Sequence, residues 1–142
     1  MLQTFVENTN CRFDLIVSNP PYFNKSLKNP DDRRSVARHT DSLNQQDLIM
    51  VADALLSDTG RLAVILPAIE GLEFILQAEI VGLCCSKKTK VVPRVGATEK
   101  RLLLEFSRTK GVCREDSLLI EIERHRYSDE FKGLTGEYYL DK

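Results

Sequence analysis

Short apolar runs alternate with helical patterns along this chain. The runs 13–18 and 61–66 are rich in aliphatic and β-branched residues, a pattern typical of strands covered on both faces in a parallel sheet. Pro67 ends the second run, because proline cannot donate a hydrogen bond within a sheet. We therefore expect two buried parallel strands, Phe13 to Ser18 and Arg61 to Leu66.

Two amphipathic helices are predicted beside the second strand. The first begins at a capping box of Ser42 and Gln45 and ends at Ser57-Asp58-Thr59-Gly60, where Gly60 is free to adopt a positive φ. Its apolar positions have helical spacing: Leu48, Val51, Ala52, Leu55 and Leu56. The second helix ends at Gly82 and carries the stripe Leu72, Ile75, Leu76, Ile80 and Leu83. We expect both stripes to face the core.

The rest of the chain predicts further strands. The pattern of Cys84 to Val92 predicts a strand with Lys87-Lys88-Thr89-Lys90 at its exposed part. Lysines of this kind commonly discourage edge-to-edge pairing on edge strands. Contact with RNA is the alternative role for them. The loop to the next strand, Arg101 to Phe106, is too short for a helical crossover, so the two strands should pair antiparallel. Alternation at 118–123 predicts one more peripheral strand, and we expect Tyr138-Tyr139-Leu140 to dock on the core.

Composition narrows the class of protein. A length of 142 residues with 42% hydrophobic and 29% charged residues is typical of one globular domain, 1–142. The net charge of −1 argues against a protein that coats nucleic acid through bulk electrostatics, but it leaves room for a local basic patch. With no apolar run of about 18 residues and no signal-peptide pattern, we expect a cytoplasmic protein with no membrane contact.

The cysteines indicate structural thiols. Cys11, Cys84, Cys85 and Cys113 show no C-x-x-C spacing and no neighbouring pair of histidines. We expect all four to be reduced and to bind no metal.

The first strand runs directly into Asn19-Pro20-Pro21-Tyr22. Ligands of parallel sheets gather at the carboxyl ends of the strands, where this turn lies. Two consecutive prolines fix φ and make the turn stiff, so the Asn19 side chain and the Pro20 carbonyl can form a fixed pair of acceptors. Tyr22 then offers a flat ring beside them.

Two acceptors and a stacking face suit a planar, conjugated NH2 group such as that of adenine. The lone pair of this nitrogen is delocalised into the ring, which makes it a poor nucleophile. If Asn19 Oδ1 and the Pro20 carbonyl each accept one N–H, the nitrogen can pyramidalise and direct its lone pair at an electrophile. The catalysis would rest on positioning and fixed dipoles.

A polar segment, 24–41, follows the turn and carries several basic residues. Lys25, Arg33, Arg34 and Arg38 are our candidates for contacts with nucleic-acid phosphates. The alternative is a solvated loop without a binding role.

The Asn19-Pro20-Pro21-Tyr22 motif after a hydrophobic strand resembles the catalytic motif of class I, AdoMet-dependent amino-methyltransferases. The chain as a whole resembles the carboxyl-terminal half of the bacterial tRNA1(Val) adenine-N6-methyltransferase family, on residues 12–23, 38–40 and 60–67 and on Tyr127-Ser128, Phe131, Leu134-Thr135 and Tyr138-Tyr139-Leu140. The resemblance implies an α/β fold: the carboxyl-terminal half of a Rossmann-like sheet, with parallel strands, crossover helices and a final antiparallel strand pair. It also implies that Asn19, Pro20, Pro21 and Tyr22 hold and stack a tRNA adenosine near the anticodon.

The family's cofactor is S-adenosyl-L-methionine, and this sequence lacks the main motif that binds it. No glycine-rich turn precedes Phe13, and the seven glycines form no G-x-G-x-x-G pattern, so we assign no cofactor-binding residue. We expect the amino-terminal AdoMet-binding half to be absent and the chain to be inactive alone. It would then need a separate half as partner, or self-associate through the open edge of Phe13 to Ser18. Alternatives are an rRNA or release-factor methyltransferase fragment and a non-catalytic RNA-binding or partner-binding remnant.

Overall fold

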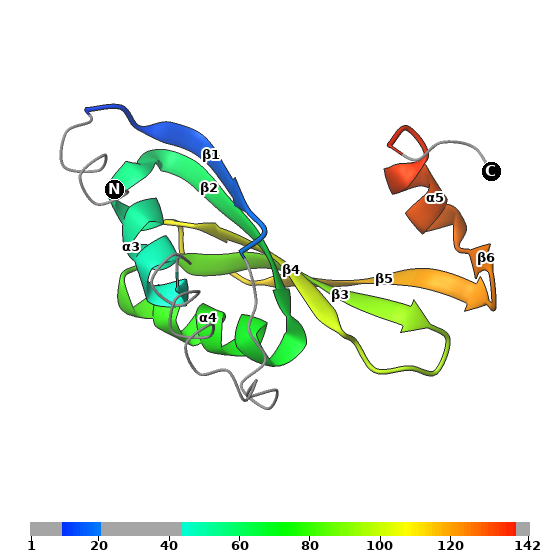
Figure 1. Cartoon of the computed structure of the whole chain (residues 1–142). Coiled ribbons are helices and arrows are strands. Elements are labelled where there is room, and N and C mark those ends of the chain that lie inside the picture. The colour runs from blue at the N-terminus through cyan, green and yellow to red at the C-terminus, as the bar shows by residue number, and fades with distance from the viewer. Residues whose placement is uncertain (1–9, 21–43, 139–142) are drawn as a thin grey trace, which may run out of the picture.

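The computed structural model describes residues 10–20 and 44–138 (Figure 1). It confirms the predicted α/β class. The elements in chain order are β1 (Phe13–Ser18), α3 (Gln45–Leu55), β2 (Leu56–Pro67), α4 (Ala68–Ile80), β3 (Cys84–Arg94), β4 (Arg101–Ser107), β5 (Arg114–Glu123), β6 (Arg126–Tyr127) and α5 (Asp129–Thr135).

The strands form one mixed sheet in the order β1-β2-β4-β3-β5-β6. β1 and β2 pair parallel, and β4 is inserted antiparallel between β2 and β3. The predicted antiparallel pairing of β3 with β4 is therefore confirmed. The prediction that β3 is an edge strand is wrong, because β5 pairs with it in parallel, from Lys87↔Arg114 to Arg94↔Glu121.

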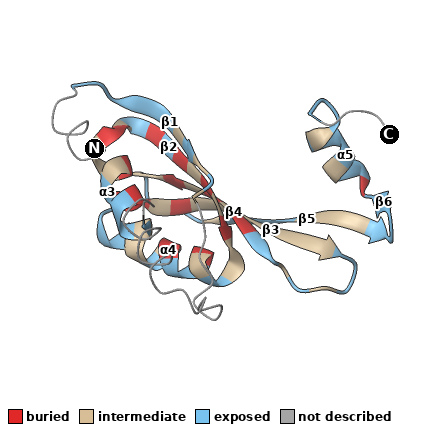
Figure 2. Cartoon of the chain, in the orientation of Figure 1, coloured by how far each residue is buried: buried red, intermediate tan, exposed pale blue. Residues whose placement is uncertain are grey.

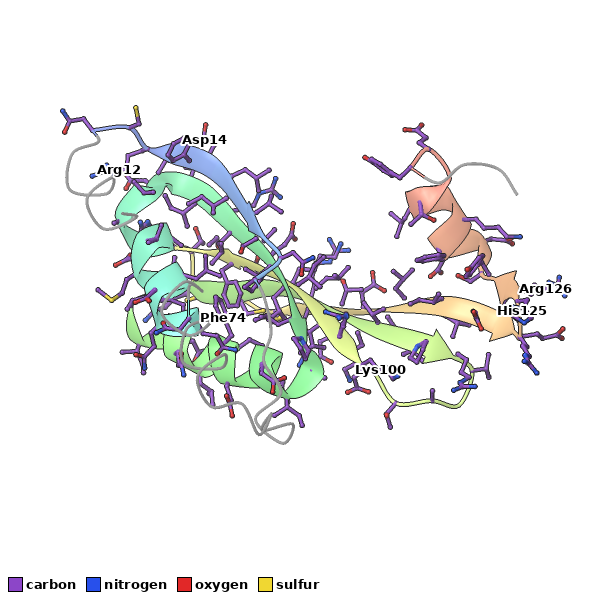
Figure 3. All side chains as sticks on the ribbon, in the orientation of Figure 1. Arg12, Asp14, Phe74, Lys100, His125 and Arg126 are labelled. Atoms are coloured by element: carbon purple, nitrogen blue, oxygen red, sulfur yellow. The ribbon has the colours of Figure 1, made fainter. Side chains whose placement is uncertain are left out.

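The core lies between the sheet and the two helices α3 and α4, which cover the same face (Figures 1 and 2). Alternate residues of β2 and β4 point into it: Leu62, Val64, Leu66, Leu102, Leu104 and Phe106. From α4, Phe74 lies against the sheet, with its ring centroid 5.3 Å from that of Phe106 (Figure 3). α3 contributes Leu48, Ile49 and Ala52, which largely confirms the predicted stripe of this helix.

β1 is less covered than the sequence predicts. Ile16 packs against the core, but on the other face Phe13, Leu15 and Val17 are 40%, 54% and 70% exposed. The expectation of cover on both faces is wrong, because α3 and α4, the helices beside β1 and β2, lie on one face of the sheet (Figure 1). Within the described residues β1 does end the sheet, as expected for an open edge.

α3 begins later than predicted. Asn44 is its N-cap, and its side chain accepts a hydrogen bond of 2.8 Å from the backbone N–H of Asp47. Ser42, the predicted cap, lies outside the described residues.

The connection from α3 to β2 also differs from the prediction. The chain passes directly from the helix into β2, and Gly60 lies inside that strand without a positive φ. Residues 57–60 form a bulge, because Phe13 pairs with Leu56 while Leu15 pairs with Arg61. A Cβ on Gly60 would lie 2.7 Å from the Phe13 carbonyl oxygen, so glycine is required here by the close approach of β1.

The predicted stripe of α4 is only partly confirmed: Leu83, just after the helix, is buried and Ile75 packs against the core, but Leu72, Leu76 and Ile80 face away from it. Gly71, Phe74 and Ala78 are buried, and Ile75 is half-buried, whereas the other stripe positions on the helix are largely exposed. Gly71 explains this choice: a Cβ there would lie 2.9 Å from Leu102 Cδ1, so its absence lets the helix approach the sheet closely. The predicted end at Gly82 is confirmed, with φ 89° and its N–H donating to the Glu79 carbonyl.

The last elements, β5, β6 and α5, extend away from the helical layer, and we call residues 114–135 the carboxyl-terminal arm (Figure 1). Tyr127 and Phe131 pack ring to ring at 5.2 Å, although Tyr127 remains 47% exposed. Tyr138 is 83% exposed, and its predicted docking on the core is wrong. Tyr139 and Leu140 lie outside the described residues. No described helix is both long and apolar enough to cross a membrane.

Candidate functional site

Asn19 and Pro20 directly follow the carboxyl end of β1, as predicted. Asn19 is exposed and Pro20 is half-buried. Because β1 and β2 run parallel, with Ser18 opposite Val64, the carboxyl ends of both strands lie at the same end of the sheet. An exposed amide at that place is accessible to a ligand.

Two contacts at the other end of β1 fix the strand that leads to Asn19. Ser57 Oγ donates a 2.6 Å hydrogen bond to Asp14 Oδ1, and Gly60 allows the Phe13 carbonyl to approach β2. From Leu15 to Ser18 the pairing with β2 then proceeds without further shift. Sequence reasoning assigned Ser57 and Gly60 to the end of a helix rather than to this positioning role, and it missed Asp14, although a carboxylate within an apolar run was a signal for it.

The structure does not test the complete motif. Pro21 and Tyr22 lie outside the described residues, and so do the four basic candidates Lys25, Arg33, Arg34 and Arg38. The predicted roles of all these residues remain predictions.

An open cleft of about 530 Å³ lies between α4, β3 and the start of β5. It contains a pair of thiols, Cys85 and Cys113, whose Sγ atoms are 3.5 Å apart. Burial, followed by the neighbouring Cys113 thiol, raises the pKa of Cys85 from 9.0 to about 12, so this thiol stays protonated and is a poor nucleophile. Within the described ranges no group of three or more side chains has the geometry of a metal site.

The same cleft contains an ion pair. Lys88 Nζ lies 3.0 Å from Glu115 Oε1, and the Lys88 side chain is only 18% exposed. The hydrogen bond with Glu115 raises the pKa of Lys88, and the same bond lowers the pKa of the Glu115 carboxyl. Lys88 is therefore paired within the sheet, and its neutralised charge makes it a weak candidate for RNA contact.

A second cavity of about 440 Å³ lies on the arm side, between the end of β3 and the β5–β6 turn. Arg94, Arg124, Glu121 and Glu123 line it and give it mixed charge; His125 and Arg126 mark the same end of the arm in Figure 3. Neither cavity is lined by Asn19 or Pro20, and neither is built on a glycine-rich turn. Neither cavity therefore carries the sequence motif expected of an AdoMet site.

No protein-family model matches this chain. A relative from Bacteroides fragilis is 43% identical over 134 residues, which cover 94% of this chain and 56% of the relative. A relative from Trichodesmium erythraeum is 42% identical over 139 residues, which cover 98% of this chain and 58% of the relative. Both are named tRNA1(Val) (adenine(37)-N6)-methyltransferase. The chain thus spans about half the length of the curated relatives it matches.

Among solved structures, the chain resembles a predicted O-methyltransferase from Agrobacterium tumefaciens. The TM-score is 0.60 at 18% identity, over 91% of this chain and 53% of that chain. At this identity the likeness concerns the fold alone. The chain therefore has the fold of part of a class I methyltransferase, and over about half of their length it is similar in sequence to the bacterial tRNA1(Val) adenine-N6-methyltransferases.

Proposed function

We propose that this chain forms the acceptor side of an AdoMet-dependent site that methylates the exocyclic amino group of a tRNA adenosine near the anticodon. The observation that carries the proposal is the position of Asn19, exposed and directly after β1, on a methyltransferase sheet. The names of the relatives support tRNA adenine as the substrate, over rRNA or a release factor.

In this proposal Asn19 Oδ1 and the Pro20 carbonyl each accept one N–H of the adenine amino group. The nitrogen lone pair then leaves conjugation with the ring and becomes available to an electrophilic carbon, which AdoMet supplies when it is bound. Pro21 keeps the turn stiff, and Tyr22 stacks on the base, a contact worth about 1–3 kcal/mol. Positioning and fixed dipoles carry the reaction, so no titrating base is required at this end of β1.

The methyl-donor side has to be provided by residues other than those described. We propose that an AdoMet-binding half, in the same polypeptide or in another, pairs with the open edge of β1. The exposed side chains Phe13, Leu15 and Val17 support this, because β1 ends the sheet within the described residues and a bare apolar face beside a sheet edge favours the addition of further structure. Without that half we expect no activity, and self-association through β1 is the alternative.

The segment after the turn is proposed to contact the tRNA backbone through Lys25, Arg33, Arg34 and Arg38. Each phosphate contact contributes to the dependence of binding on salt. Replacing one of these residues by Gln should therefore lower the slope of log K against log[salt] by about 1. An unchanged slope for all four variants would favour the solvated loop.

The test of the reaction is reconstitution. The chain is mixed with the part of the Bacteroides fragilis relative that it does not match, and methyl transfer to tRNA is measured. Asn19→Ala should lower the rate by about 10²-fold while tRNA binding persists. Asn10→Ala, which removes an exposed amide before β1, is the matched control and should retain the full rate. Equal rates for both variants would remove Asn19 from the mechanism.

Calorimetric titration of AdoMet into the chain alone tests the division into two halves. We expect no binding, because the sequence has no glycine-rich turn and neither cavity described above is built on one. Binding at micromolar strength would contradict the proposal that the donor side comes from elsewhere. If the reconstituted pair binds tRNA but transfers no methyl group, the non-catalytic RNA-binding alternative replaces the proposal.

A further inference from the structure

The outer face of α4 carries a continuous apolar stripe. Its members are spaced at i, i+3, i+7 and i+11 and lie opposite the face that packs on the sheet: Ile69, Leu72, Leu76 and Ile80, which are 71%, 52%, 66% and 84% exposed. Together they expose on the order of 500 Å² of apolar surface, near the upper limit for the largest patch on a typical monomer. Isolated exposed apolar residues are ordinary, whereas four on one helix face form a contiguous apolar patch of the kind that often marks an interaction site.

The charged residues of the two helices that form this layer, α3 and α4, are all acidic. α3 and α4 carry Asp47, Asp53, Glu70, Glu73 and Glu79 and no Lys or Arg, although the chain as a whole has a net charge of only −1. By helical spacing, Glu73 and Glu79 flank the stripe on its two sides, and both are exposed. Among the described basic residues, Lys88 and Lys110 line the cleft beside Glu79, and Lys88 is paired with Glu115. Arg108 is paired with Asp53 of α3, and the Lys100 carbonyl accepts a hydrogen bond from the first residue of α4.

The carboxyl end of α4 adds to this negative potential. Its last turn contains Glu79 and no basic residue, so the negative end of the helix dipole is not compensated by a side chain of the helix. Ile80, the most exposed member of the stripe, lies at that end. Apolar area and negative potential therefore coincide.

We infer that the α4 stripe is a docking surface for a basic amphipathic helix of a protein partner. Such a helix would place its apolar face on Leu72, Leu76 and Ile80 and its Lys or Arg residues beside Glu73 and Glu79. The surface lies on the helical layer, away from Phe13, Leu15 and Val17 on the other face of the sheet (Figures 1 and 2). The inference therefore does not rest on the proposed function.

Charge argues against the other occupants. A second copy that packed α4 on α4 would bring the acidic flanks of both helices together, and like charges across an interface are unfavourable. An RNA backbone would be repelled by the same carboxylates.

The test measures binding of two helical peptides of about 18 residues, long enough to retain helicity. Both have Leu at the positions that complement the stripe; one carries Lys at the flanking positions and the other carries Glu. Fluorescence anisotropy with the full chain should show the Lys peptide binding at least about tenfold more tightly than the Glu peptide. Equal affinities would overturn the inference.

Two substitutions in the stripe test whether the peptide binds to α4. Leu76→Gln and Ile80→Gln change exposed positions to a good helix former, so the fold should persist, and circular dichroism checks this. Each substitution should weaken the affinity of the chain for the Lys peptide by at least about tenfold. Val112→Gln, at a 93% exposed position outside the stripe, is the control and should change nothing. Glu73→Gln should reduce the preference for the Lys peptide.

Three results would contradict the proposal. Unchanged peptide binding in both stripe variants would remove α4 from the interface. A dimer of the chain in sedimentation that dissociates on Leu76→Gln would identify a second copy as the occupant. Loss of tRNA binding on Leu76→Gln, with the fold intact, would assign the surface to RNA.

Discussion

Replacing Phe74 by alanine tests which face of α4 is buried. Phe74 is 0% exposed and its ring packs against Phe106 at 5.3 Å, so truncation removes a complete aromatic side chain from the core. The matched change is Ile80→Ala on the same helix, where the side chain is 84% exposed.

The expected effects differ by several kcal/mol. A buried Phe→Ala substitution costs about 3–5 kcal/mol, because the apolar transfer free energy is lost and a cavity remains. Ile80→Ala should change the free energy of unfolding by no more than about 0.5 kcal/mol, since it removes little buried area. The higher helix propensity of alanine adds a few tenths of a kcal/mol in the opposite direction.

Urea denaturation followed by circular dichroism measures both variants. With an m-value of about 2 kcal/mol/M, Phe74→Ala should lower the midpoint by roughly 2 M, or leave a marginal domain unfolded without denaturant. Ile80→Ala should leave the midpoint almost unchanged. If Ile80→Ala destabilises the chain as much as Phe74→Ala, the helix is rotated about its axis, and the docking surface proposed above does not exist.

Three further predictions concern other contacts. Gly60→Ala should destabilise the chain by about 1–3 kcal/mol, because a Cβ would lie 2.7 Å from the Phe13 carbonyl oxygen; an unchanged melting temperature would contradict the close approach of β1. Arg108→Ala should lower the free energy of unfolding by about 1.5–3 kcal/mol in denaturation experiments. The Arg108 guanidinium donates one hydrogen bond of 2.7 Å to the Asp53 carboxylate and two more, of 2.6 and 3.2 Å, to the backbone carbonyls of Asp53 and Leu56. Iodoacetamide at pH 8 should label exposed Cys11 well before Cys85, whose pKa is about 12, and mass spectrometry of the digested chain checks the order. Because the folded pKa of Cys85 exceeds the ordinary 9.0, its contribution to stability is present below about pH 9 and is lost as the pH rises toward 12.

Local signals in the sequence predicted the elements well. The apolar runs at 13–18 and 61–66, the helical spacing in α3 and the glycine at the end of α4 each act within one element, and all four are confirmed. Asn19 lies at the end of its strand for the same reason, since the polar turn begins where the apolar run stops.

The errors concern relations between elements. β3 was expected at an edge because its lysines resemble the lysines of edge strands, yet β5 pairs with it and Glu115 neutralises Lys88. Likewise, residues 57–60 have the composition of a turn, but pairing with β1 makes them a bulge within β2. Neither partner strand can be identified from the composition of one segment.

The sequence by itself determined the strands β1 to β4, part of β5, the helices α3 and α4, the carboxamide after β1 and the resemblance to methyltransferases, whereas β6 and α5 were not predicted. Only the tertiary structure decided which side of α4 is buried, because apolar residues occupy both of its faces. Periodicity favoured the larger Leu and Ile side chains, whereas packing selected the face with Gly71, Phe74 and Ala78, where the missing Cβ of Gly71 lets the helix approach the sheet. Steric fit against Leu102 on the sheet, a contact between segments about thirty residues apart, made that choice and left Leu72, Leu76 and Ile80 exposed.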